Sequence, residues 1–366
     1  MSEAASRRWR TETQMGPERL EPKWVDLFEE ILGLASARPG EVAAIFAESG
    51  TRRVLVDLAE HALHRMGLKY YHVTVPTPAA RAGVPLRSTG TSLAIGGLTQ
   101  VVDALASADL IVDISIEGLL HSPERPTLVA KGARIFMIGN EHPEIFERLR
   151  PQPGLNELCL HGAKLITKAK SMRVTSAAGT DLCVGLGKAE GRGSAGATQG
   201  PGSFGYWPAG LCLTNPSPGS VNGRVVFMPG DANLTFKRYF EASVTLTIVD
   251  DFVTAIDGDN LDSELMRSYF AAFGDRDAYA TSHVGWGMNP AARWDSLIMY
   301  DKADVNGIEL RAFAGNFLFS TGANEAAGRY SACHFDLPMR GCTIQLDGDQ
   351  PVVDEGVLRE DLRLQV

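Results

Sequence analysis

Apolar residues in the first half of the chain recur at helical spacing in some segments and form short continuous runs in others. The helical spacing predicts amphipathic helices, and the continuous runs predict buried strands. Helices are expected at residues 24–34, 53–66, 98–108, 143–149 and 158–169, and strands at 41–47, 70–75, 109–115 and 133–139. Because strands and helices alternate, we expect an open, mostly parallel sheet with helices on both faces.

The pattern changes after residue 170, where short alternating segments predict strands rather than helices. Strands are expected at 171–176, 181–186, 224–228, 242–249 and 252–258, one helix at 261–273, and mostly strands from residue 280 onward. Residues 188–219 are rich in Gly, Pro and Ser and contain one aromatic cluster, which favours a functional loop. We therefore predict a polar tail at 1–20, an α/β domain at 21–170 and a β-rich α+β domain at 171–366.

Composition excludes several classes of function. The formal net charge of -9 argues against a nucleic-acid partner, which needs a basic face. No apolar run approaches the roughly 18 residues of a membrane span, and the first residues lack the apolar core of a secretory signal. The five cysteines are scattered, so neither a disulfide framework nor a zinc ribbon is expected. No glycine-rich phosphate loop links a strand to a helix, which argues against a nucleotide cofactor. A cytoplasmic location fits these features best.

His334 and Asp336 are two residues apart, so on a strand both side chains point to the same face. They provide two of the three ligands of a divalent-metal site. His283 is the best candidate for the third, because Gly285 and Gly287 beside it allow a close backbone approach. Two histidines and one carboxylate form the facial triad of non-haem Fe(II) oxygenases, which leaves positions open for substrate and dioxygen. The same residue types also bind catalytic zinc or manganese, so these residues alone leave the metal open.

His121 lies in the loop that follows the predicted strand at 109–115. In open α/β sheets, ligands bind beyond the carboxyl ends of the strands. His121 is therefore a stronger functional candidate than His61, His64 or His72, which lie on a predicted helix and strand. An ordinary surface-loop role is the alternative for His121.

Residues 281–294 and 331–339 together resemble 2,5-dihydroxypyridine 5,6-dioxygenase of bacterial nicotinate degradation, a family related to the M29 leucine aminopeptidases. The resemblance covers most of the chain. It implies an M29 aminopeptidase-like fold, one Fe(II) per chain and a symmetric homo-oligomer. The implied reaction is extradiol-type cleavage of 2,5-dihydroxypyridine, or of a related hydroxylated aromatic ring, in which both atoms of dioxygen are inserted to give N-formylmaleamate. The implied metal ligands are His283, His334, Asp336 and, as a weaker serine ligand, Ser320.

The resemblance also implies residues around the substrate. Leu120 and His121 match a Leu-His pair that lines the substrate pocket of the family, which makes His121 an acid/base or hydrogen-bonding residue. The family has a histidine just before a Trp-Pro pair, whereas this chain has Tyr206 before Trp207. A tyrosine donates a hydrogen bond but does not take up a proton near neutral pH, so this departure bears on the exact substrate. Apart from the resemblance, the aromatic residues Trp207 and Trp286 are further candidate walls of the pocket, with ordinary core packing as the alternative.

A metallo-aminopeptidase of the M29 type is the main alternative function. Those enzymes hold two metals with additional glutamates, one of which closes an Asn-x-Pro-x-Gly-Glu motif. This chain has Ser220 at that glutamate position and His283 at the position of a second glutamate. The loss of two carboxylates favours a mononuclear site and hence the dioxygenase. A non-catalytic binding protein with the same fold is the third alternative.

Overall fold

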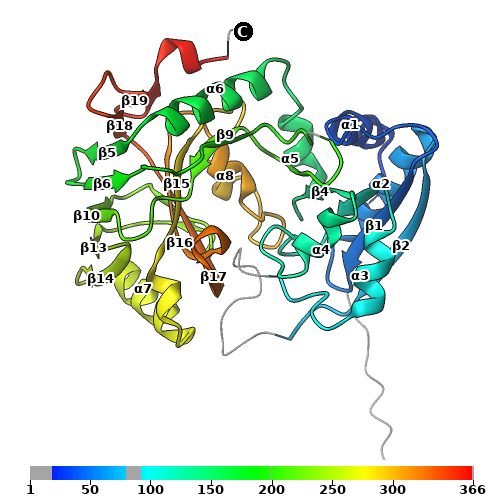
Figure 1. Ribbon diagram of the computed structural model, residues 1–366, viewed down its shortest axis with the longest axis horizontal. Helices are drawn as coiled ribbons and strands as arrows, with labels where there is room; N and C mark the ends of the chain where they lie inside the picture. The colour runs from blue at the N-terminus through cyan, green and yellow to red at the C-terminus, as the bar shows by residue number, and fades with distance from the viewer. Residues whose placement is uncertain (1–18, 80–91, 199, 365–366) are drawn as a thin grey trace, which may run out of the picture.

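Four strands of the N-terminal half and one strand of the C-terminal half form a five-stranded parallel sheet (Figure 1). The structure, a computed structural model, describes residues 19–79, 92–198 and 200–364. The strand order is β2-β1-β3-β4-β8, and every neighbouring pair is parallel. The strands are β1 (Val42–Glu48), β2 (Lys69–Val75), β3 (Leu110–Asp113), β4 (Arg134–Ile138) and β8 (Phe204–Trp207). The central strands β1, β3 and β4 are buried on both faces, which explains their continuous apolar sequences.

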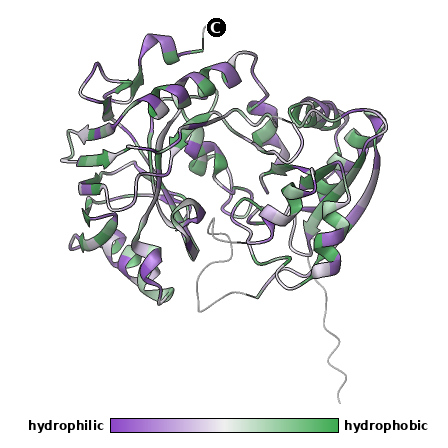
Figure 2. Cartoon of the chain, in the orientation of Figure 1, coloured by the Kyte–Doolittle hydropathy of each residue, from purple (hydrophilic) through white to green (hydrophobic). Residues whose placement is uncertain are grey.

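Helices cover both faces of this sheet. One hydrophobic core joins α1, α2 and α5 to the sheet, and a second core joins α3 and α4 to its other face. The helices are α1 (Pro22–Gly33), α2 (Arg53–Arg65), α3 (Thr99–Ala106), α4 (Arg125–Ala130) and α5 (Pro143–Arg148). Figure 2 shows hydrophobic and hydrophilic residues on the same helices, as expected when one side of each is buried. Among the described residues, no helix has the length and apolar character that crossing a membrane requires.

The predicted α/β architecture of the first half is confirmed, but two elements differ from the predicted boundary at residue 170. β8 lies after that boundary and nevertheless joins the first sheet beside β4. α6 (Leu155–Lys168) lies before it and packs into the core of the β-rich unit. The glycine-rich stretch at 188–219 is therefore not one loop, because it contributes a strand to the first sheet. Residues 1–18 of the predicted polar tail lie outside the described residues.

The β-rich unit begins with an eight-stranded sheet in the order β14-β13-β10-β6-β5-β18-β19-β20. Its strands alternate between buried and more exposed residues, as β13 shows, because one face packs on the core. The strands are β5 (Ser171–Ser176), β6 (Asp181–Gly185), β10 (Val221–Phe227), β13 (Val244–Val249), β14 (Phe252–Asp257), β18 (Cys342–Leu346), β19 (Val353–Asp354) and β20 (Val357–Leu358). Smaller elements of this unit are α7 (Leu261–Ala272), η1 (Arg276–Tyr279), η2 (Ser296–Ile298), η4 (Glu360–Leu362), β11 (Ala232–Asn233) and β12 (Arg238–Tyr239).

A third sheet, antiparallel and five-stranded, carries the candidate metal ligands. Its order is β17-β16-β15-β9-β7. The strands are β7 (Arg192–Ser194), β9 (Leu211–Thr214), β15 (Thr281–Gly287), β16 (Phe317–Asn324) and β17 (Arg329–Met339). Two short helices adjoin these strands in sequence. α8 (Ile308–Ala312) precedes β16, and η3 (Glu325–Ala327) lies between β16 and β17.

Strand alternation on β17 separates core residues from site residues. Cys333 and Phe335 are fully buried in the hydrophobic core of the β-rich unit. His334 and Asp336 alternate with them and therefore point to the opposite face of the sheet. The packing role expected for Cys333 is confirmed.

Candidate metal centre

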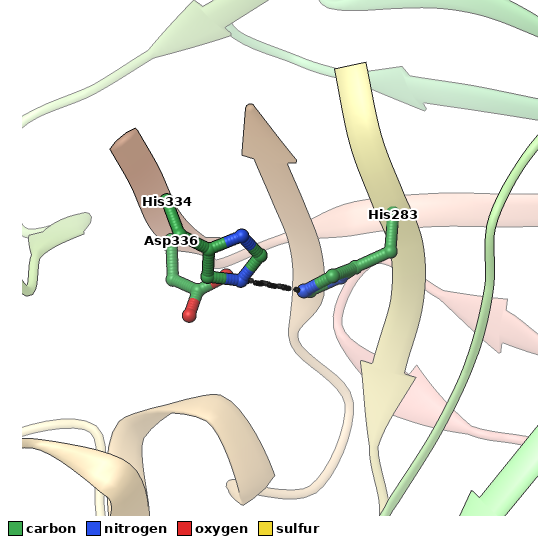
Figure 3. A group of neighbouring side chains, drawn as sticks. All are labelled: His283, His334 and Asp336. Carbon is green, nitrogen blue, oxygen red and sulfur yellow. Dashed lines mark hydrogen bonds and ion pairs between the residues drawn. The ribbon is translucent and has the colours of Figure 1, made fainter. Parts of the chain in front are cut away.

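Three buried side chains converge on one face of the third sheet (Figure 3). His283 comes from β15, and His334 and Asp336 come from β17, on the far side of β16. Nε2 of His283 lies 3.2 Å from Nε2 of His334. Oδ1 of Asp336 lies 3.3 Å from Nε2 of His283 and 3.4 Å from Nε2 of His334. The three atoms form a nearly equilateral triangle.

This triangle has the dimensions of a metal-binding face. A divalent ion about 2.0–2.2 Å from each nitrogen or oxygen ligand separates neighbouring ligand atoms by about 3.0–3.4 Å. Oδ1 of Asp336 is buried and accepts no hydrogen bond from any residue that the structure describes. When both histidines are neutral and unprotonated at Nε2, as metal binding requires, the lone pairs of these three atoms repel one another, and a bound cation removes that repulsion. The residues present therefore fit a metal ion.

The electrostatics of the site favour the protonation states that bind metal. Burial alone would raise the pKa of Asp336, but its interactions with His334, Arg311 and His283 hold it well below its usual range. Burial lowers the pKa of His283, which favours the neutral imidazole. Metal ions bind charged carboxylates and neutral imidazoles, so the site is prepared for a metal near neutral pH.

Arg311 is a member of the site that the sequence did not reveal. It lies on α8, and its Nε donates to Oδ2 of Asp336 at 2.5 Å. The carboxylate thus turns one oxygen to the arginine and the other to the histidines. Glu141 of the α/β unit holds the start of α8, because its carboxylate accepts hydrogen bonds from the backbone N–H groups of Asn306 and Ile308. No local pattern links residues 311 and 336, since their contact depends on how the helix packs against the sheet.

A β-bulge aims His283 at the site. Ser282 and His283 of β15 lie opposite the single residue Ser320 of β16. The Ser320 hydroxyl accepts from the backbone N–H of His283 at 3.1 Å and donates to its carbonyl oxygen at 3.2 Å. Ser320 is also fully buried and pairs with Asp336 across the sheet. It lies beside the three candidate ligands, and its own role as a ligand stays a prediction.

The glycines near His283 are required by the packing of neighbouring backbone. A Cβ atom on Gly285 would lie 2.1 Å from the carbonyl oxygen of Cys212 on β9. A Cβ atom on Gly287 would lie 2.2 Å from the carbonyl oxygen of Phe313, next to α8. The close approach expected from the sequence is present, and the approaching group is the protein's own chain.

His121 reaches the site from the α/β unit. Its loop begins at the end of β3, where the buried carboxylate of Asp113 accepts hydrogen bonds from two backbone N–H groups of the loop. The centroid of the His121 ring lies 4.3 Å from that of His334. Nδ1 of His121 lies 2.9 Å from a carboxylate oxygen of Glu325, on η3 of the β-rich unit. Glu325 is a second site residue that sequence reasoning missed, because only the fold of the β16–β17 hairpin brings it to His121.

Tyr206 lies on β8 and is half-buried. Burial raises the pKa of Tyr206 to about 12, although a hydrogen bond with Ser194 acts in the opposite direction. The phenol therefore keeps its proton and can donate a hydrogen bond throughout the ordinary pH range. Contact of Tyr206 with a substrate stays a prediction.

The three remaining predicted substrate residues differ in their surroundings. Leu120 is half-buried beside His121. Trp207 packs in the core of the α/β unit, where its Nε1 donates to the carbonyl oxygen of Leu149 at 2.8 Å. Trp286 is fully buried in the core of the β-rich unit. The observed contacts of both tryptophans are structural, and contact of either with a substrate stays a prediction.

The chain is similar to proteins of described activity along nearly its whole length. A family model described as 2,5-dihydroxypyridine 5,6-dioxygenase matches residues 23–360. The chain belongs to this dioxygenase family. It is 35% identical over 335 residues to the 2,5-dihydroxypyridine 5,6-dioxygenase of Pseudomonas putida, which covers 90% of this chain and 94% of that relative. The solved structure of 2,5-dihydroxypyridine dioxygenase from Pseudomonas putida KT2440 matches with a TM-score of 0.87 at 34% identity, covering 93% of this chain and 98% of that one.

A more distant solved structure shares the architecture. AmpT from Thermus thermophilus matches with a TM-score of 0.60 at 14% identity, covering 92% of this chain and 98% of that one. At this identity the likeness shows the fold alone. The predicted fold class, an α/β domain followed by a β-rich domain, is confirmed by both structures.

Proposed function

We propose that this chain is an Fe(II)-dependent, extradiol-type 2,5-dihydroxypyridine 5,6-dioxygenase. In the proposed reaction the bond between ring carbons 5 and 6 breaks, and each carbon receives one atom of dioxygen. Carbon 5 becomes a carboxyl carbon and carbon 6 a formyl carbon, so that N-formylmaleamate is the product. Substrate and product differ only by the two oxygen atoms, and the reaction therefore needs no external reductant.

One observation carries the proposal. A buried triangle of two imidazole nitrogens and one carboxylate oxygen lies in a chain of a dioxygenase family. This donor set suits non-haem Fe(II), because three ligands on one face leave other coordination positions open. Within the described part of the chain, it is the single cluster of three or more His, Cys, Asp or Glu side chains that could hold a metal, which favours one ion per chain. Ser220, at the position of an aminopeptidase glutamate, donates its hydroxyl to the carbonyl oxygens of Gly185 and Ser217.

His283, His334 and Asp336 would hold the ion, with Ser320 as an assisting fourth ligand. Bound Fe(II) supplies the redox chemistry that allows dioxygen to react with an electron-rich ring. Arg311 keeps Asp336 charged and fixes the orientation of its carboxylate by binding Oδ2. Such outer partners of metal ligands determine which atom faces the ion.

His121 would accept the proton of the ring hydroxyl on carbon 5. Burial and the neighbouring His334 lower the pKa of His121, so its ring is neutral near neutral pH and able to take a proton. Tyr206 would donate a hydrogen bond that orients the ring, because its phenol keeps its proton. Leu120, Trp207 and Trp286 are proposed to contact the apolar face of the substrate.

Oxygen uptake tests this proposal. The protein is loaded with Fe(II) without oxygen, mixed with 2,5-dihydroxypyridine and exposed to air, while oxygen consumption and ring absorbance are followed. We expect oxygen uptake that is stoichiometric with the substrate consumed, in protein that holds one iron per chain. A panel of related hydroxypyridines then shows which rings the enzyme accepts. Hydrolysis of leucine anilides with two divalent ions per chain, and no oxygen uptake, would instead identify an aminopeptidase. If the protein binds the substrate without turnover, and His334→Ala leaves the affinity for the substrate unchanged, the chain is a binding protein.

The proposal also includes the cellular setting of the enzyme. All five cysteines are free thiols in the structure, which is consistent with a reducing cytoplasm. A symmetric homo-oligomer is proposed from the family resemblance alone. Light scattering coupled to size-exclusion chromatography measures the mass of the particle and would reject this last point if it gave the monomer mass.

A further inference from the structure

The contact between Glu325 and His121 joins the two structural units at the candidate site. Glu325 begins η3, the turn between β16 and β17, and these two strands carry three of the four proposed ligands. His121 belongs to the loop after β3 of the α/β unit. Oε1 of Glu325 lies 2.9 Å from Nδ1 of His121, and the exposed fractions of the His121 and Glu325 side chains are 14% and 32%.

The ionisation of Glu325 determines where the proton of the His121 ring lies. Burial raises the pKa of Glu325, but its hydrogen bond with His121 and the nearby Arg125 contribute to the opposite effect, and the pKa falls to about 2. An ionised carboxylate only accepts hydrogen bonds, so Nδ1 of His121 must be the donor. A neutral imidazole has one N–H group, and its lone pair is therefore on Nε2.

The surroundings of the His121 ring leave Nε2 available. The ring packs against His334 with an interplanar angle of 40°, and Glu325 binds the opposite ring nitrogen. The hydrogen bond between His121 and Glu325 is made at Nδ1 and does not involve Nε2. The ring is therefore held at Nδ1 and along one face, and neither of these two contacts uses Nε2.

We propose that Glu325 is a positioning residue that holds His121 in the Nδ1–H tautomer, with the Nε2 lone pair presented to the substrate hydroxyl. Without the carboxylate, the ring can rotate or adopt the Nε2–H tautomer, which has no lone pair at that atom. The kinetic consequence of this arrangement rests on the proposed function, whereas the tautomer itself does not. The two are therefore tested separately.

Nitrogen NMR of the metal-free protein measures the tautomer directly. Histidine is labelled with nitrogen-15, and His121→Asn identifies the signals of His121 above neutral pH. We expect the pattern of a protonated Nδ1 and an unprotonated Nε2 in the native chain, and a loss of this single pattern in Glu325→Gln, whose amide can donate as well as accept. A native His121 with its proton on Nε2 would overturn the proposal, whatever the enzyme does.

A double-mutant cycle tests whether Glu325 acts through His121. Outer partners of site residues typically contribute about 10–100-fold, so Glu325→Gln should lower kcat by that factor while KM and iron content stay unchanged. In a His121→Asn background the same change should cause no further loss. Asp361→Asn is the matched control, because Asp361 binds His161 at 3.0 Å in a more exposed pair elsewhere, and it should leave kcat unchanged.

The outcomes separate the inference from the proposed function. If Glu325→Gln lowers kcat by the same factor in the wild-type and His121→Asn backgrounds, Glu325 acts without His121 and the positioning role is overturned. A wild-type protein that shows the expected tautomer but no oxygen uptake would reject the proposed function and leave the tautomer assignment intact.

Discussion

Replacing Ser320 by alanine tests how the bulge in β15 is stabilised. The Ser320 hydroxyl bridges the backbone N–H and carbonyl groups of His283, at a place where two residues of β15 lie opposite one residue of β16. Ser320→Ala removes both hydrogen bonds and leaves the His283 N–H without this partner. The position is fully buried, so bulk water does not replace the hydroxyl.

The size of the effect follows from this burial. A buried donor that loses its partner costs about 1–3 kcal/mol, and we expect Ser320→Ala to lower the unfolding free energy of the metal-free protein by that amount. Thr321→Val is the matched control on the same strand. The Thr321 hydroxyl is also buried but has no hydrogen-bond partner among the described residues, so its removal should be neutral or slightly stabilising.

Urea unfolding in the presence of a chelator, followed by tryptophan fluorescence, measures both variants. Fe(II) affinity is measured separately without oxygen, because a ligand role for Ser320 acts only when metal is present. If Ser320→Ala and Thr321→Val unfold at the same urea concentration in the chelator, the bridging role assigned to the hydroxyl is refuted. A loss of Fe(II) affinity without a loss of metal-free stability would leave Ser320 as a ligand alone.

Three further changes test other parts of the account. Arg311→Met should destabilise the metal-free protein by about 3–5 kcal/mol, because it leaves the buried charge of Asp336 without its arginine, and urea unfolding with chelator measures this. Gly322→Ala should be far more destabilising than Gly328→Ala in thermal unfolding. Both glycines have positive φ, but a Cβ on Gly322 would lie 1.9 Å from a carbonyl oxygen of β17, whereas one on Gly328 meets nothing within 4 Å. Tyr206→His should add an inflection near neutral pH to the dependence of kcat on pH. The wild type should lack this inflection, because its phenol, with a pKa of about 12, loses its proton only at high pH. Identical pH dependences of kcat in the two proteins would contradict a position of residue 206 near the reaction.

Local sequence patterns predicted most of the α/β unit because its strands are continuous apolar runs and most of its helices have apolar residues at helical spacing. The helix expected at 53–66 is α2, Arg53–Arg65, and the strand expected at 41–47 is β1, Val42–Glu48. β8 was missed for a physical reason. It is four residues long, it is surrounded by glycines and prolines, and it is stabilised by pairing with β4, which is remote in sequence.

The candidate site likewise contains some residues that the sequence predicts and others that it does not. His334 and Asp336 were predictable because strand alternation alone places them on one face, and His283 followed from residue type and the glycines beside it. Arg311 and Glu325 were not predictable, because each reaches its partner through tertiary packing. Charged residues with no spacing pattern are indistinguishable in sequence from solvated surface residues.

Labelling with oxygen-18 gas tests the central claim most directly, namely that iron held by His283, His334 and Asp336 supports insertion of dioxygen into the ring. The Fe(II)-loaded protein is given 2,5-dihydroxypyridine under the labelled gas, and the product is analysed by mass spectrometry. We expect N-formylmaleamate with both labelled atoms, and no product from Asp336→Ala at the same iron concentration. A product with one labelled atom or none, or equal activity in Asp336→Ala, would contradict this claim.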